Sequence, residues 1–378
     1  MSEIPFSDGP GPSLAPRTLV GDASLGRRLA EFLRLNCKEQ GLFLGAVLLV
    51  VAARLILLPG AVEMMAWSIT QSLRPFVGAW ALAICGYLAI RSLSSGSLSK
   101  SFEYLWAEVF TRRNAAVAIP ALVAAGLLMN SFSHFKSAIP TFNPYGLDAL
   151  FSDADRYLHF GTDPWRWLDA VLGYGTATVI LDRIYYLWFF AVYLSMGLVM
   201  GLPDKFGIRH RFMLTYVLIW GVLGIIFATA LSSVGPIFYD RAYGGPSSFT
   251  ELTRNLEAVN AAWGLNTLQV RDVLWASYVN DIDTIISGIS AMPSIHNAMC
   301  VLFFLAARHI NRWLAAAAAV FALIIFVGSV HLGWHYAIDA YASAFGVALL
   351  WKLSGLLTGN AAARRAMAPL HVAEPVRP

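Results

Sequence analysis

Long apolar runs without an alternating pattern constrain this chain more than any other feature. They extend over about 17 to 20 residues, the length of a helix that crosses a bilayer. Only 13% of the 378 residues are charged and 57% are hydrophobic, whereas a soluble protein carries about 25% charged residues. Backbone groups that face lipid must pair internally, and the lack of a two-residue period disfavours a β-barrel. We therefore expect an all-α, polytopic transmembrane bundle.

Eight apolar segments are the predicted spans of this bundle. They lie at 41–58, 75–91, 115–131, 179–200, 212–234, 295–309, 313–330 and 335–357, and the sixth is short for a crossing. The predicted division of the chain is a cytoplasmic N-terminal segment (1–40), a three-span region (41–131), a second membrane domain (132–357) and a cytoplasmic tail (358–378).

The basic residues orient these spans. With the N-terminus in the cytoplasm, eighteen of the 27 lysines and arginines lie on inside flanks and seven lie outside. The seven are Arg74, Lys136, Arg156, Arg166, Arg241, Arg254 and Arg271, and the two in or beside spans are Arg54 and Arg183. Because basic residues favour the cytoplasmic side, both termini are expected inside. The net charge of +4 then reflects topology, and no nucleic-acid partner is expected.

Two long outside loops, 132–178 and 235–294, mix aromatic and apolar residues with charges. This composition predicts helices that lie in the membrane interface. A simple cover for the embedded bundle is the alternative interpretation.

Three histidines lie near span ends on the predicted outer side, in AMPSIHNAM (291–299) and GSVHLGWHYAIDAY (328–341). His335 and Asp339 are four residues apart, so on a helix they would share one face, with His331 one turn earlier. Such a carboxylate can fix the histidine tautomer and leave Nε2 as a nucleophile or base. His296 lies at the same membrane face, and Ser294 before it is a candidate N-cap in an anion-binding helix start.

Each of these histidines, taken alone, also fits a role without catalysis. An intramembrane histidine can make a polar contact between helices, or it can relay protons in a transporter. A relay would distribute acids through the depth of the bundle, and apart from Asp182 and Asp339 the predicted spans have almost none. The joint occurrence of the three groups therefore favours a site for phosphoryl chemistry.

The motifs resemble those of a known family. PSIH (293–296) and HYAID (335–339) look like the second and third motifs of the type 2 phosphatidic acid phosphatase superfamily. VGPIFYDRAYGG (234–245) and DADRYLHFGTDPW (153–165) are similar to the branch that contains inositol phosphorylceramide synthase. The resemblance implies that His335 attacks phosphorus, Asp339 orients it and His296 protonates the leaving alkoxide.

The chain departs from the phosphatases at two phosphate-binding positions. Their first motif, a lysine and an Arg-Pro, is absent, and the arginine expected before the third motif is Ser329. A dianionic monoester needs more positive charge than a diester, which counts against simple monoester hydrolysis. Arg241 and His331 are candidate replacements. The resemblance to the synthase branch also makes Asp182 a candidate further site acid, with an interfacial ion pair to Arg183 as the alternative interpretation.

The sequence thus predicts a lipid phosphotransferase that needs no cofactor or metal. Its substrate would be a lipid phosphate or phospholipid, with a polyol or lipid hydroxyl as acceptor. We expect a multi-pass protein of a bacterial inner membrane with its site on the periplasmic face. The alternatives are a lipid phosphate or polyprenyl diphosphate phosphatase that uses water, and a non-enzymatic transporter or structural membrane protein.

Overall fold

The computed structural model describes residues 20–59, 65–202, 204, 206–280 and 288–367, and these parts of the chain contain helices and connecting segments without a strand. The parts of the predicted terminal segments at 1–19 and 368–378 lie outside the described residues. The helices are α1 (Val20–Leu57), α2 (Met65–Ser95), α3 (Leu98–Tyr104), η2 (Leu105–Val109), α4 (Arg112–Phe142), α5 (Asp148–Leu158), α6 (Pro164–Leu172), α7 (Thr176–Gly201), α8 (Arg209–Leu218), η3 (Ile219–Phe227), α9 (Ala228–Ala230), η4 (Pro236–Phe238), α10 (Tyr239–Tyr243), α11 (Thr250–Trp263), α12 (Asn266–Asn280), α13 (Ile295–Ala307), α14 (Arg312–His331) and α15 (Ala337–Met367).

Seven helical stretches among the described residues are long and apolar enough to cross a membrane, which makes the chain a multi-pass membrane protein. They correspond to seven of the eight predicted spans. The remaining predicted span, the sixth along the chain, corresponds to α13, which has only 13 residues. At 1.5 Å per residue this helix is about 20 Å long, whereas the hydrocarbon layer is about 30 Å thick. It packs against α14 and α15 inside the bundle.

The fourth helix corrects one predicted loop boundary. The sequence places an outside loop from residue 132, but α4 continues to Phe142. The apolar run is interrupted there because Asn130, Ser133 and Lys136 are polar. These residues instead line an internal cavity, so the polar stretch is the inner face of a helix and not a loop.

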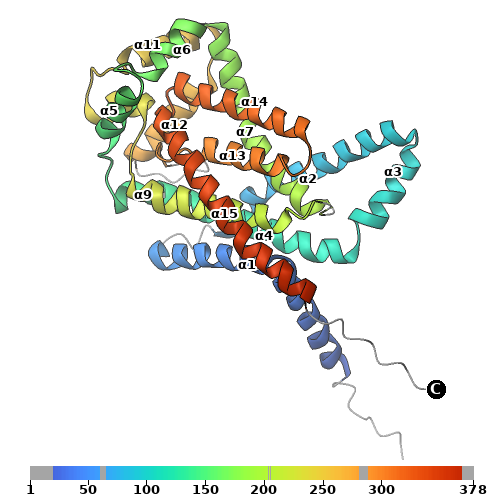
Figure 1. Ribbon diagram of the computed structural model, residues 1–378. Coiled ribbons are helices and arrows are strands. Elements are labelled where there is room, and N and C mark those ends of the chain that lie inside the picture. The colour runs from blue at the N-terminus through green and yellow to red at the C-terminus, as the bar shows by residue number, and fades with distance from the viewer. Residues whose placement is uncertain (1–19, 60–64, 203, 205, 281–287, 368–378) are drawn as a thin grey trace, which may run out of the picture.

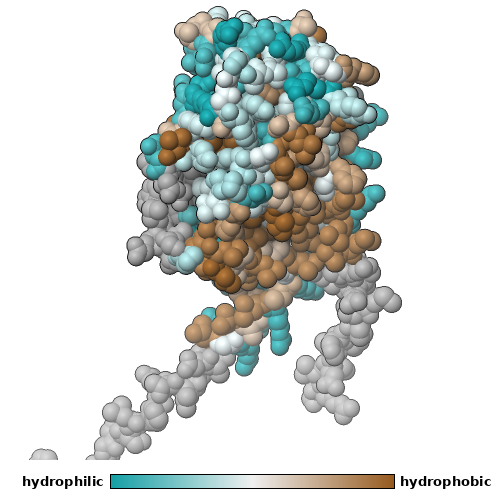
Figure 2. Space-filling view, turned by 90° about the vertical axis from the view of Figure 1, so that its left-hand side faces the viewer, coloured by the Kyte–Doolittle hydropathy of each residue, from teal (hydrophilic) through white to brown (hydrophobic). Residues whose placement is uncertain are grey.

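The bundle has two distinct ends in Figure 1. The start of α1 and the end of α15 both lie at the lower right, whereas α5, α6 and α11 gather at the upper left. In Figure 2 hydrophilic side chains cover the upper part of the molecule, and hydrophobic side chains cover the lower part. The short helices of the two predicted outside loops thus form a polar cap on an apolar body.

The predicted orientation leads to a direct labelling test. In a background with the exposed Cys37 and Cys85 replaced by alanine, a cysteine at Ser247 should react with an impermeant maleimide in intact cells. A cysteine at Asn360 should react only after the membrane is opened, because it lies on the inside in the predicted topology. The reverse pattern would place the candidate site in the cytoplasm.

Candidate active site

The segment after α9 joins the two histidine motifs. The Ser233 carbonyl accepts the Ala291 N–H (3.1 Å), and the Ile237 N–H donates to the Gly333 carbonyl (2.8 Å). Gly235 has a φ of +88°, and a Cβ there would lie 2.7 Å from the Trp334 carbonyl oxygen. Only glycine fits this close approach. The VGPIF part of the sequence therefore holds the second and third motifs side by side.

His335 is held by two acceptors on the same ring nitrogen. Its Nδ1 lies 2.9 Å from the Ala291 carbonyl and 3.2 Å from Asp339 Oδ2. Because both neighbours only accept hydrogen bonds, Nδ1 carries the proton and Nε2 keeps its lone pair. His335 lines a cavity, and its Nε2 has no hydrogen-bond partner among the described residues. The ring is therefore fixed in the tautomer that a nucleophilic Nε2 requires.

His335 contacts Asp339 as predicted, but the backbone between them is not the continuous helix that the sequence argument assumed. The sequence argument placed both on one helical face, but α15 begins at Ala337 and His335 lies in the turn before it. That turn brings the imidazole back over the first helical turn, where Asp339 Oδ2 also accepts the Tyr336 N–H (3.1 Å). His331 does not continue the stripe, because it ends α14.

His296 faces His335 from the start of α13. Ser294 is the N-cap of this helix, as predicted, and its hydroxyl accepts the Asn297 N–H. The His296 ring lies 4.7 Å from the Tyr185 ring and 4.2 Å from the Trp188 ring, between centroids. Its centroid is 5.7 Å from that of His335. One phosphate can therefore contact both imidazoles.

Hydrogen bonds also join α14 and α15 to the start of α13. The Ser343 hydroxyl is within 2.8 Å of the Ser294 carbonyl and 2.6 Å of the Asp339 carbonyl. Asn297 Nδ2 donates to the Ser294 and Ser329 hydroxyls. Ser329, where the phosphatases have arginine, is thus a buried contact between α13 and α14.

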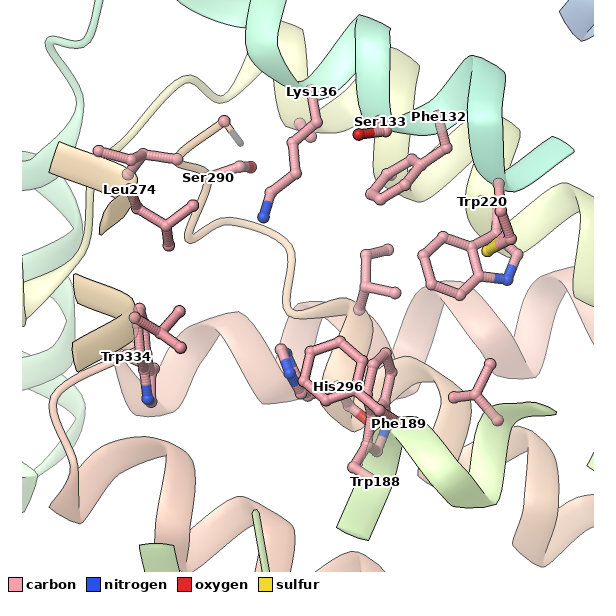
Figure 3. A pocket seen from close by; sticks show the side chains of 18 of the residues that line it. Phe132, Ser133, Lys136, Trp188, Phe189, Trp220, Leu274, Ser290, His296 and Trp334 are labelled. Carbon is pink, nitrogen blue, oxygen red and sulfur yellow. Dashed lines mark hydrogen bonds between the residues drawn. The ribbon is translucent and has the colours of Figure 1, made fainter. Parts of the chain in front are cut away.

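Both histidines open into one cavity of about 580 Å³. Its walls come from α2, α4, α7, η3, α12 and the two motif segments, and most of the lining is aromatic or aliphatic. Figure 3 shows Lys136 of α4 reaching into this space, with its amino group on the side of Ser290 and His296. The site therefore combines a mostly apolar chamber with the imidazoles of His296 and His335, a third imidazole from His134 and the ammonium group of Lys136.

Two buried aspartates of α5 fix the loops that carry the site. Asp148 accepts the N–H groups of Val234 and Gly235 and the Tyr336 hydroxyl. Asp155 accepts the N–H groups of Ala337 and Ile338, the first two residues of α15. Burial raises the pKa of the Asp155 carboxyl, and these two N–H groups oppose the shift. Helix α5 thereby sets the start of α15, where Asp339 lies.

The remaining predicted residues lie outside the cavity lining. Asp182 is buried and accepts the Asn266 and Thr267 N–H groups at the start of α12, besides pairing with Arg183 (3.0 Å). Arg241 pairs with Asp272 (2.8 Å). His331 Nε2 is 3.0 Å from the Thr178 hydroxyl, and its ring stacks on Tyr174. These three residues therefore make contacts between helices and do not lie beside His296 and His335.

Sequence reasoning missed Lys136, Asp148 and Asp155. The signal for Lys136 was its helical spacing from Met129 and Ser133, which places all three on one face of α4. The two aspartates had no such signal, because each caps a segment that is distant in the sequence.

Comparison with known families gives a match over the second half of the chain. The model of the PAP2 superfamily, PAP2_3, matches residues 149–353. This range contains both histidine motifs and the Ser233–Ile237 segment, whereas α1 to α4 precede it. Comparisons with curated proteins and with solved structures give no significant match.

Proposed function

The chain belongs to the PAP2 superfamily, and from this membership we propose that it transfers a phosphoryl or phosphoryl-alcohol group from a lipid donor to a hydroxyl acceptor. The proposed activity resembles that of inositol phosphorylceramide synthase. The observation that carries the proposal is the placement of His296 and His335 in one cavity, with ring centroids 5.7 Å apart.

The proposed first step uses His335 as the nucleophile. Its Nε2 forms a bond to phosphorus while the bond from phosphorus to the leaving alkoxide breaks. Asp339 and the Ala291 carbonyl hold the Nδ1 proton, so positive charge that develops on the ring is stabilised by a carboxylate.

The proposed acid is His296, which gives its proton to the leaving alkoxide. The Tyr185 and Trp188 rings pack against its imidazole, with centroids 4.7 Å and 4.2 Å away. In the second step His296 takes the proton of the acceptor hydroxyl, whose oxygen attacks phosphorus and releases Nε2. Protons and bonds balance over the two steps, and both imidazoles return to their starting states.

The cavity favours an alcohol acceptor over water. Its walls are mostly aromatic and aliphatic, and such walls hold little ordered water. An alcohol bound against these walls would exclude water from a phosphohistidine in the chamber. This is the physical reason to prefer transfer to hydrolysis.

Labelled lipids test the proposal. The full chain in nanodiscs, incubated with isotopically labelled phospholipids with and without inositol, should convert label into a new phosphodiester that mass spectrometry detects. The His335→Ala protein is the negative control. Release of free phosphate or of an alcohol phosphate alone, with any alcohol present, would identify hydrolysis instead of transfer, and no conversion of any phospholipid would overturn the proposal.

A further inference from the structure

Lys136 is a basic side chain in the cavity lining. Among the described residues that line the cavity, Lys136 is the only lysine or arginine, and no aspartate or glutamate is present. Lys136 makes no hydrogen bond or ion pair with a described side chain. Arg241, the arginine predicted as a replacement phosphate ligand, pairs with Asp272 outside the cavity lining. Among the described lining residues, the ammonium group of Lys136 thus has no carboxylate counterion.

The position of Lys136 is fixed by a tight contact with the second motif segment. Gly288 has a φ of +80°, and a Cβ there would lie 2.5 Å from the Lys136 carbonyl carbon and 2.7 Å from the Ser137 nitrogen. Glycine is required for this approach. His296 follows Gly288 by eight residues in the same segment. The contact at Gly288 therefore helps to fix the position of α4 relative to His296.

The surroundings of the Lys136 side chain are mostly apolar. Aromatic and aliphatic side chains form most of the cavity lining, and an uncompensated ammonium group is costly in such surroundings. In Figure 3 the Lys136 amino group points into the cavity that His296 also lines. An anion bound in this cavity removes that cost.

We propose that Lys136 is the residue that binds the substrate phosphate, and that its single positive charge matches the site to a phosphodiester lipid. This inference rests on the proposed function and adds the substrate class. A diester carries one negative charge, whereas a phosphomonoester carries about two at neutral pH. One ammonium group balances the first charge and leaves the second uncompensated. The cation comes from α4, outside the matched residues 149–353, which gives the N-terminal region a part in the site.

The test compares charge variants of the full chain in nanodiscs, with phosphatidylinositol as the diester and phosphatidic acid as the monoester. The wild type should use the diester with at least about tenfold higher kcat/KM. Lys136→Met should lower kcat/KM for the diester on the order of 10²-fold, as expected for loss of a charged phosphate contact in a dry site. Lys136→Arg should keep activity within about tenfold, because a guanidinium group also binds phosphate.

Chemical restoration separates charge from folding. Lys136→Cys should be as inactive as Lys136→Met and should regain activity with 2-aminoethyl methanethiosulfonate, which attaches an ammonium group. Propyl methanethiosulfonate, of similar length and neutral, should not restore it. Wild-type protein treated with both reagents controls for the exposed Cys37 and Cys85.

Four results would overturn the assignment of Lys136: a Lys136→Met protein within threefold of wild type, equal restoration by both reagents, a fully aminoethylated Lys136→Cys protein that stays inactive, or a wild type that prefers phosphatidic acid. Each of these requires an active wild type. A wild type that converts neither lipid would overturn the proposed function itself.

Discussion

His335→Ala should abolish transfer, with a loss of about 10⁴-fold or more, because no other group takes the place of a covalent nucleophile. The variant removes the Nε2 atom that faces the cavity and the ring that Asp339 and the Ala291 carbonyl hold. The measurement is the initial rate of labelled phosphodiester formation in nanodiscs. Protein from wild type, but not from the variant, should also carry acid-labile label from a phosphate-labelled donor.

Asp339→Asn tests the orientation of the His335 ring separately from nucleophilic attack by that ring. The amide keeps the shape but loses the charge that fixes the Nδ1 proton, so activity should fall on the order of 10²- to 10⁴-fold and remain measurable.

For the His335→Ala variant, the matched control is His309→Ala, since His309 follows the C-terminal end of α13 and does not line the cavity. Near-normal turnover by His335→Ala would show that another group attacks phosphorus.

The sequence predicted the helical class and most spans because each depends on local composition. A run of apolar residues must become a buried or lipid-facing helix wherever it lies in the chain. The same reasoning failed at Lys136, where polar residues that face an internal cavity resemble the start of a loop. Hydropathy averages over the faces of a helix, so it does not distinguish a polar inner face from a polar end.

The site was predictable to the extent that its chemistry is local. His335 and Asp339 are four residues apart, and their contact forms although a turn, not a helix, positions the histidine. The placement of His296 followed from topology. By contrast, Asp155 acts on the start of α15 over a sequence separation of 182 residues. Such a contact depends on the tertiary fold, and no pattern in one sequence indicates it.

His296→Ala should lower transfer from an ordinary phospholipid on the order of 10²- to 10⁴-fold, the range for loss of a general acid. The expected loss is smaller than for His335→Ala, because the nucleophile remains. A phosphodiester that releases p-nitrophenol should partly restore the rate, since this leaving group departs as an anion without protonation. The measurement is release of p-nitrophenol by each variant.

The comparison between the two histidines decides their roles. Activated donors relieve the need for an acid but not the need for a nucleophile, so they should restore His296→Ala and leave His335→Ala inactive. Restoration of both variants to the same extent would mean that water attacks without a covalent intermediate. Restoration of His335→Ala alone would exchange the two assignments. The 5.7 Å between the ring centroids permits either histidine to reach phosphorus. Of the two, and among the described residues, only His335 has a carboxylate on its Nδ1. That asymmetry is the structural reason to expect attack by His335 and protonation by His296.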